Sequence, residues 1–148
     1  MKQLILCMAL AFTHFTECNQ PDKYAKTSLI VGKWKHIKDD VLTFNAAGKA
    51  IMMDNPDYSK SDNYFQFNAD GTGVANIAVN DGSGKYNAVP FEYTLKNTVL
   101  VLKYKESSET DQVTTLTSKS LVLHAEYSKK DDDGKLISTQ KVDLYFSK

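Results

Sequence analysis

Two residues of the chain place a basic group beside an acidic one at a spacing that suits chemistry. His124 and Glu126 are separated by one residue, so a strand would put an imidazole and a carboxylate on one face, as acid–base work or a metal would require. Val122 shares that face, while the apolar residues at 121, 123, 125 and 127 occupy the other. A solvent-facing pair is therefore the favoured interpretation, and a catalytic or metal role is the alternative.

Two further groups of polar residues have weaker signatures. His36 shares a face with Trp34, so it could line the floor of a cavity, although a structural histidine is the favoured interpretation. The run from Asp131 to Gly134 begins like a calcium loop but lacks the alternating ligands and the distal glutamate. We interpret it as a solvated hairpin tip. The sequence thus predicts no catalytic residue, no metal site and no cofactor, and hence a protein that is not an enzyme.

The elements that must position these side chains are strands. One tryptophan, seven phenylalanines and eight tyrosines, with valine and threonine recurring in the second half, favour β-structure. Short alternating segments follow one another across hairpin-length turns, and no βαβ alternation is present. We expect an all-β fold, an antiparallel up-and-down barrel of about eight or nine strands, because closure removes exposed sheet edges.

Several boundaries can be placed from local signals. The first strand is expected at 31–37, followed by a turn at 39–40 and a hairpin over 41–53. The segment 54–63 is expected to be a loop over one mouth of the barrel. The segment 106–111 is expected to be a polar connection between strands.

The charge composition argues against several classes of partner. Lysine supplies all 18 basic residues, which balance 18 acidic ones, and arginine is absent. Without arginine, no planar fork is present for bidentate capture of phosphate or carboxylate. Zero net charge also gives no reason to expect binding to nucleic acid or to an anionic membrane surface.

The N-terminal residues predict export. Lys2 followed by the apolar run 4–12 fits a signal peptide over residues 1–18 and is too short to span a bilayer. Cys18 follows that run and precedes a polar tether at 19–28. We favour a lipoprotein whose Cys18 is acylated, although Glu17 replaces the usual small residue. The alternative is a secreted protein with a free thiol. The expected location is the periplasm or the outer membrane, with membrane contact only through the lipid.

Three segments carry a resemblance to a known family. They are 29–34, which contains Gly32 and Trp34, the turn-containing segment 65–73, and the late strand at 121–123. Together they resemble the short lipocalin-like domains of bacterial envelope lipoproteins, over residues 29–148. The resemblance implies a barrel closed at its base by Gly32 and Trp34. The family's arginine over the tryptophan has no counterpart, and only Lys141 or Lys148 could substitute for it.

The resemblance also implies a function. We expect a small apolar or amphipathic ligand inside the barrel, since about eight strands leave room either for side chains or for one small ligand. The candidate cavity-lining residues are Phe65, Phe67, Phe91, Tyr93, Leu102, Tyr104, Leu123 and Tyr127. The alternative is a filled core with an outer surface that binds another envelope protein.

Overall fold

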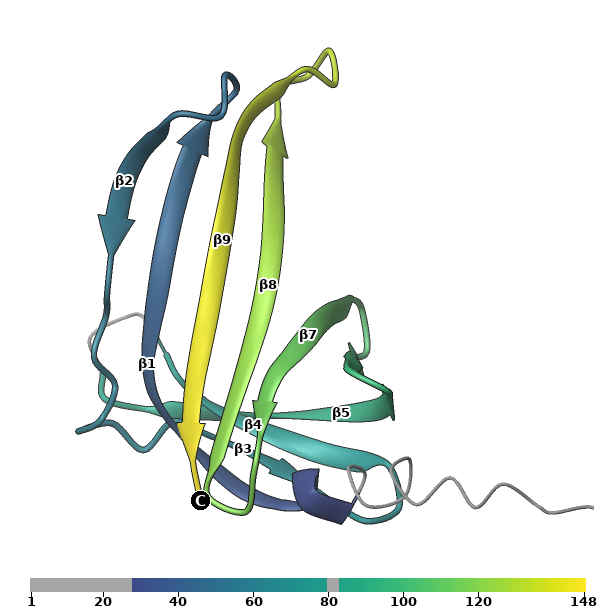
Figure 1. Ribbon diagram of the computed structural model, residues 1–148. Coiled ribbons are helices and arrows are strands. Elements are labelled where there is room, and N and C mark those ends of the chain that lie inside the picture. Colours follow the sequence, from purple (N-terminus) through teal and green to yellow (C-terminus); the bar gives the residue numbers. More distant parts are fainter. Residues whose placement is uncertain (1–27, 80–82) are drawn as a thin grey trace, which may run out of the picture.

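The computed structural model describes residues 28–79 and 83–148. The predicted signal peptide, Cys18 and nearly all of the tether lie outside these residues. Within them, nine antiparallel strands follow a helical turn at 28–30 (Figure 1). The strands are β1 (Gly32–Asn45), β2 (Ala50–Asp54), β3 (Tyr64–Phe67), β4 (Thr72–Ala78), β5 (Tyr86–Lys96), β6 (Val99–Lys103), β7 (Ser108–Leu116), β8 (Ser120–Lys130) and β9 (Leu136–Ser147). No helix in the described part of the chain is long and apolar enough to cross a membrane.

The sheet closes on itself through its first and last strands. The strand order is β2-β1-β3-β4-β5-β6-β7-β8-β9, and β1 also pairs with β9. The beginning of β1 pairs with β3 and its end with β2, while β9 pairs along the opposite edge from Lys35 to Asn45. The result is an eight-strand barrel with β2 as an additional strand, which confirms the expected fold class.

One strand replaces the two expected between residues 31 and 44. The turn predicted at Asp39 and Asp40 is wrong, because both residues lie inside β1 and pair with β9. A bulge at Ile37 shifts the register, since His36 pairs with Phe146 and Lys38 with Tyr145. This bulge puts the side chain of Asp39 on the inner face of the barrel. Pairing with the long strand β9 has overridden the local turn signal.

A second boundary also differs from the expectation. The segment 106–111 was expected to be a connection, but Ser108–Leu116 forms β7 and pairs with β6 and β8. Asp111 and Val113 alternate with exposed neighbours and are both buried. The polar composition of this segment therefore reflects a strand with an acidic inner face.

Trp34 fills the closed end of the barrel. Its side chain is fully buried, and its Nε1 donates a 2.6 Å hydrogen bond to the Ile30 carbonyl. The Lys148 ammonium lies 4.7 Å from the ring centroid and donates hydrogen bonds to the carbonyls of Leu29 and Val31. Lys148 thus occupies the place of a covering cation. Lys141, the other candidate, pairs with a carboxylate on the outer face.

Aromatic rings fill the space next to Trp34. Phe67 has its ring centroid 5.4 Å from that of Phe91 and 5.0 Å from that of Tyr93, both in edge-to-face arrangements. Gly73 pairs with Phe91 across β4 and β5. A Cβ at Gly73 would collide with the Phe91 ring and with the Gln66 carbonyl, so this glycine gives the ring its space. The closed end is a solid core.

The opposite end of the barrel is taller and more open. Strands β1, β8 and β9, with β2 at their side, rise beyond β3, β4 and β5, which cross below them at a steep angle (Figure 1). Strands β1, β8 and β9 have 14, 11 and 12 residues, whereas β3 has 4. The long strands therefore extend beyond the short ones, and their far ends have no side chains of the short strands to pack against.

Candidate functional site

A cavity of about 480 Å³ lies at this open end. Its wall is formed by the first half of β1, the starts of β3 and β7, and the later parts of β4, β8 and β9. The loop between β2 and β3 and the residue after β6 complete it. The lining residues are His36, Tyr58, Asn63, Phe65, Ile77, Ala78, Val79, Tyr104, Glu109, Tyr127 and Leu144. A volume of this size suits a small organic molecule.

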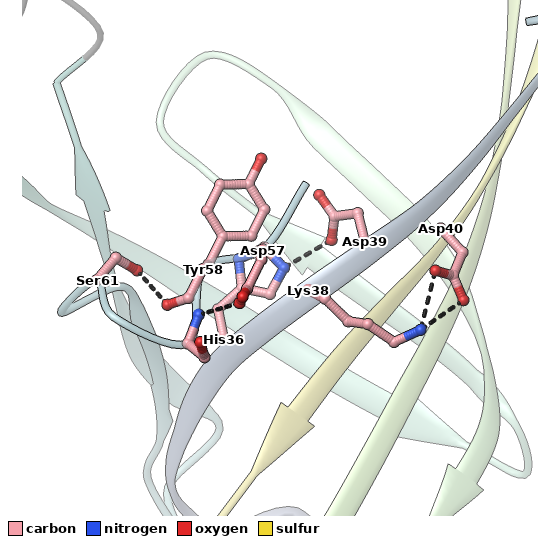
Figure 2. A network of polar contacts seen from close by, with 8 residues as sticks. His36, Lys38, Asp39, Asp40, Asp57, Tyr58 and Ser61 are labelled. Atoms are coloured by element: carbon pink, nitrogen blue, oxygen red, sulfur yellow. Dashed lines mark hydrogen bonds and ion pairs between the residues drawn. The ribbon is translucent and has the colours of Figure 1, made fainter. Parts of the chain in front are cut away.

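His36 is held at the cavity by contacts on several sides. Its Nε2 lies 2.6 Å from the Asp39 Oδ1, and its ring stacks between Tyr58 and Phe146 with centroids 4.5 and 4.9 Å away. Figure 2 shows the Asp39 carboxylate reaching the imidazole, with the Lys38–Asp40 pair on the other side of β1. The bulge at residue 37 allows this His–Asp contact. His36 therefore lines the cavity, and its ring is held in place by Asp39 and the two stacked aromatic rings.

The loop between β2 and β3, residues 55–63, contributes part of the wall. The Tyr58 amide donates to the Ile37 carbonyl at 2.7 Å, which fixes the loop against the bulged part of β1. Asn63 is buried, and its carbonyls accept hydrogen bonds from the His36 and Ala78 amides. Ser61 donates to the Tyr58 carbonyl at 2.8 Å (Figure 2). These bonds make the loop an ordered side of the cavity.

Carboxylates and tyrosine hydroxyls gather on one side of the cavity. Burial raises the pKa of Tyr104 well above its ordinary value, and the carboxylates of Glu109 and Asp111 raise it further. Burial also raises the pKa of Tyr127, and the same two acids raise it further. Asp111 is only 4% exposed, and burial, followed by the repulsion of Glu109, raises its pKa to about 6. This side of the cavity therefore carries negative charge in a partly desolvated setting.

The predicted lining residues divide into two groups. Phe65, Tyr104 and Tyr127 line the cavity. The other five are at most 7% exposed and belong to the packed core, so they do not line this cavity: Phe67, Phe91, Tyr93, Leu102 and Leu123. They share the inner face with the lining residues, but they lie nearer the closed end, where facing side chains fill the interior.

The His124 and Glu126 pair lies on the outside of the barrel. The His124 Nδ1 is 2.7 Å from Asp143 and its Nε2 is 3.4 Å from Glu126, which also accepts a bond from Lys141 at 2.9 Å. All of these side chains are partly exposed. The described residues contain no group of three or more ligating side chains arranged for a metal ion. The geometry is that of a surface ion-pair network.

Several residues in or beside the cavity were not singled out from the sequence. Asp39 was assigned to a turn, while Glu109 and Asp111 were assigned to a polar connection. The available signal was the alternation of Glu109, Asp111 and Val113 at period two, which places the three on one face of a strand. Tyr58 had no such signal, because its position depends on how the loop folds back on β1.

The fold and the cavity together define a class, the closed antiparallel barrel with one open end. The family model of the lipocalin-like domain matches residues 30–123. The chain belongs to the lipocalin-like domain family. Among curated proteins, no significant match is found.

Solved structures with a similar chain course include bacterial and mammalian proteins. A lipocalin-like protein from Bacteroides uniformis is 18% identical, with 81% of this chain and 98% of that chain covered and a TM-score of 0.49. An uncharacterized protein from Bacteroides eggerthii is 17% identical, with 80% and 98% covered and a TM-score of 0.46. A deswapped triple mutant of bovine odorant binding protein is 20% identical, with 81% and 74% covered and a TM-score of 0.44. The fold assignment rests on the family match and on the strand pairing of this chain itself.

Proposed function

We propose that this domain is a non-enzymatic binding protein that takes a small apolar or amphipathic molecule into the open end of its barrel. The observation that carries the proposal is the cavity of about 480 Å³, whose wall combines aromatic and aliphatic side chains with a few polar groups. Pockets of this composition bind organic ligands through apolar contact and use the polar groups for orientation. The half-exposed ring of Tyr127 gives the cavity an accessible side.

The arrangement of His36 supports binding over catalysis. Its ring is stacked on both faces, and one nitrogen is engaged by Asp39. A histidine held in this way serves as a rigid part of the wall, because a general base needs a nitrogen within reach of the proton that it removes. We therefore assign it a positioning role toward the ligand.

The proposal also covers location. We propose export and a lipid anchor on Cys18, supported by the positive and apolar N-terminal pattern that precedes this cysteine. Metabolic labelling with a radioactive fatty acid should mark the wild-type chain but not a Cys18→Ser variant. Labelling of neither chain, with release of the protein into the medium, would contradict the anchor.

Dye binding tests the cavity directly. A neutral apolar dye such as N-phenylnaphthylamine should gain fluorescence with the purified domain, and Tyr127→Ala should weaken its affinity. Tyr145→Ala is the matched control, because Tyr145 lies on the outer face of β9 beside Lys38 and Asp40. Absence of dye binding, or an equal loss in both variants, would contradict ligand binding in the cavity.

A second candidate function is supported by strand β2. All five of its residues are exposed, with Met53 at 69%, and among the described strands β2 pairs with β1 alone. A sheet edge with exposed apolar side chains suits strand addition by another envelope protein. A photocrosslinker at position 53 in intact cells should then give specific adducts. A crosslinker at position 132, in the charged β8–β9 connection, is the control. The same adducts at equal yield from both positions would indicate nonspecific contact.

A further inference from the structure

We infer that the ligand of this cavity is a small organic cation, an amine with an apolar or aromatic body, and that the cavity disfavours anions such as fatty acids. This inference rests on the proposed function and names the ligand class of the same site. Three features carry it: the balance of charge on the wall, a buried carboxylate next to the cavity, and the gathering of aromatic rings.

The charge balance of the wall is negative. Glu109 lines the cavity, and Asp111 lies two residues further on the same face of β7. Among the described lining residues none is a lysine, and His36 is engaged by Asp39. On the neighbouring strands, Lys38 and Lys141 are each bound to a carboxylate on the outer face. The other lysines of β1, β6 and β8 are not part of the cavity wall. Glu109 and Asp111 therefore remain uncompensated by any cation of the described wall.

The cost of this uncompensated negative charge is clearest at Asp111. It is 4% exposed, and among the groups that act on its carboxylate, Glu109 opposes ionisation and His124 on β8 favours it. A buried carboxylate is costly to ionise, because it has lost contact with water and a repelling carboxylate lies close by. The raised pKa of this group reflects that cost. An ammonium group in the adjoining cavity would supply both the opposite charge and hydrogen-bond donors.

The aromatic part of the wall suits the same ligand. Tyr58, Phe65, Tyr104 and Tyr127 line the cavity. The faces of such rings attract cations by about 0.5 to 2 kcal/mol per contact, and they also accept an apolar body. Because the chain contains no arginine and no lysine lines the described wall, a carboxylate or phosphate ligand would find repulsion from Glu109 and Asp111 without a counterion.

Three probes of similar size separate charge from shape. Phenethylamine is a cation near neutral pH, phenethyl alcohol is neutral, and hydrocinnamate is an anion. Isothermal titration calorimetry of the purified domain should give an affinity for the amine at least about tenfold above that for the alcohol, with the anion weakest, since a nearby charge pair readily supplies that difference. Equal affinities, a preference for the anion, or no binding of the amine would overturn the inference. Binding of the neutral dye reports separately on the proposed function.

Isosteric variants assign the effect to named carboxylates. Asp111→Asn and Glu109→Gln remove charge with little change of shape, so each should lower amine affinity by about three- to tenfold, while alcohol affinity stays within about twofold. Glu126→Gln on the outer face is the matched control and should leave all three affinities unchanged. A loss of amine affinity in the control alone, or none in the two cavity variants, would overturn the assignment of the cation to this site.

Discussion

The two ends of this barrel are built from the same alternation of inward and outward residues, yet one is solid and the other hollow. At the closed end, Trp34, Phe67 and Leu100 are essentially fully buried. At the open end, the inner face carries Glu109 and Tyr127, which remain exposed to a substantial degree. The difference arises from strand length, because β3 and β6 end where β1, β8 and β9 continue. A close-packed core needs neighbouring side chains around every residue. At the open end, the short strands supply no such neighbours on part of the circumference.

The largest expected contrast between the two ends is in stability. Trp34→Ala should lower the free energy of unfolding by about 3 to 5 kcal/mol, because it leaves a cavity and an unbonded Ile30 carbonyl. Tyr127→Ala should cost about 1 kcal/mol or less, because the ring is 46% exposed. Urea denaturation followed by circular dichroism measures both variants, and does not depend on tryptophan fluorescence.

A milder variant keeps the contrast measurable if Trp34→Ala does not fold. Trp34→Phe retains an aromatic plug but loses the hydrogen bond to Ile30 and the larger ring under Lys148. It should still be less stable than Tyr127→Ala. Equal losses at the two ends would mean that the open end is packed as tightly as the closed one, which would contradict the cavity.

The closed end was accessible from the sequence, because its signals are local. Gly32 and Trp34 stand at the start of the first strand, and Phe65 and Phe67 alternate before a glycine-containing turn. Period-two patterning places such residues inward without knowledge of their partners. It does not separate core from cavity wall, and Phe67 and Phe65 show this, since they share a face but only Phe65 reaches the cavity.

The open end was less accessible, because its geometry depends on contacts between distant segments. Asp39 faces inward only because the bulge at Ile37 shifts the register against β9. Tyr58 reaches His36 only because its loop folds back on β1. Asp111 is polar in sequence, so it was assigned to a connection although it is buried in a strand. Residues that break the polar-outside pattern are frequent at functional sites, and here they mark the cavity.

The second expected effect tests the charge of the open end. Asp111 has a pKa of about 6 in the folded chain, above its ordinary value of 3.8. The folded state therefore binds the proton more tightly, so stability falls as pH rises from about 4 to about 6 and stays lower above that window. Asp111→Asn should gain about 1 to 3 kcal/mol at about pH 8 and nearly nothing at about pH 4. Urea denaturation at both pH values measures the gain.

The other groups around Asp111 define the controls. Glu109 lies on its own strand, Tyr104 follows β6, and Tyr127 and His124 lie on β8. The two tyrosines have raised pKa values and stay neutral in this window. His124 favours the ionised form of Asp111, so the measurement is repeated in a His124→Ala background. A gain that is equal at both pH values would contradict an Asp111 that is ionised at a cost in the folded chain.

The smallest expected effect concerns the outer face, where the ion pairs have access to water. His124 has a raised pKa because it is hydrogen-bonded to Asp143 and, with a smaller effect, to Glu126. This contribution to stability is fully present below the unfolded pKa of about 6.5 and is lost as pH rises through the folded value. His124→Ala should therefore cost more at about pH 5.5 than at about pH 8.5, by less than about 1 kcal/mol, because water screens an exposed pair.

The same variant decides whether the outer face has a role in the cavity. His124 points away from the interior and pairs with Glu126 and Asp143, whereas the proposed cation lies beside Tyr104 and Glu109 on the inner face. Amine affinity, dye affinity and metal content should all be unchanged in His124→Ala. A loss of bound metal or a tenfold loss of amine affinity would move the functional site from the open end to the outside of the barrel. Conversely, unchanged affinities and metal content would place the function at the open end, where β1, β8 and β9 extend beyond the packed core.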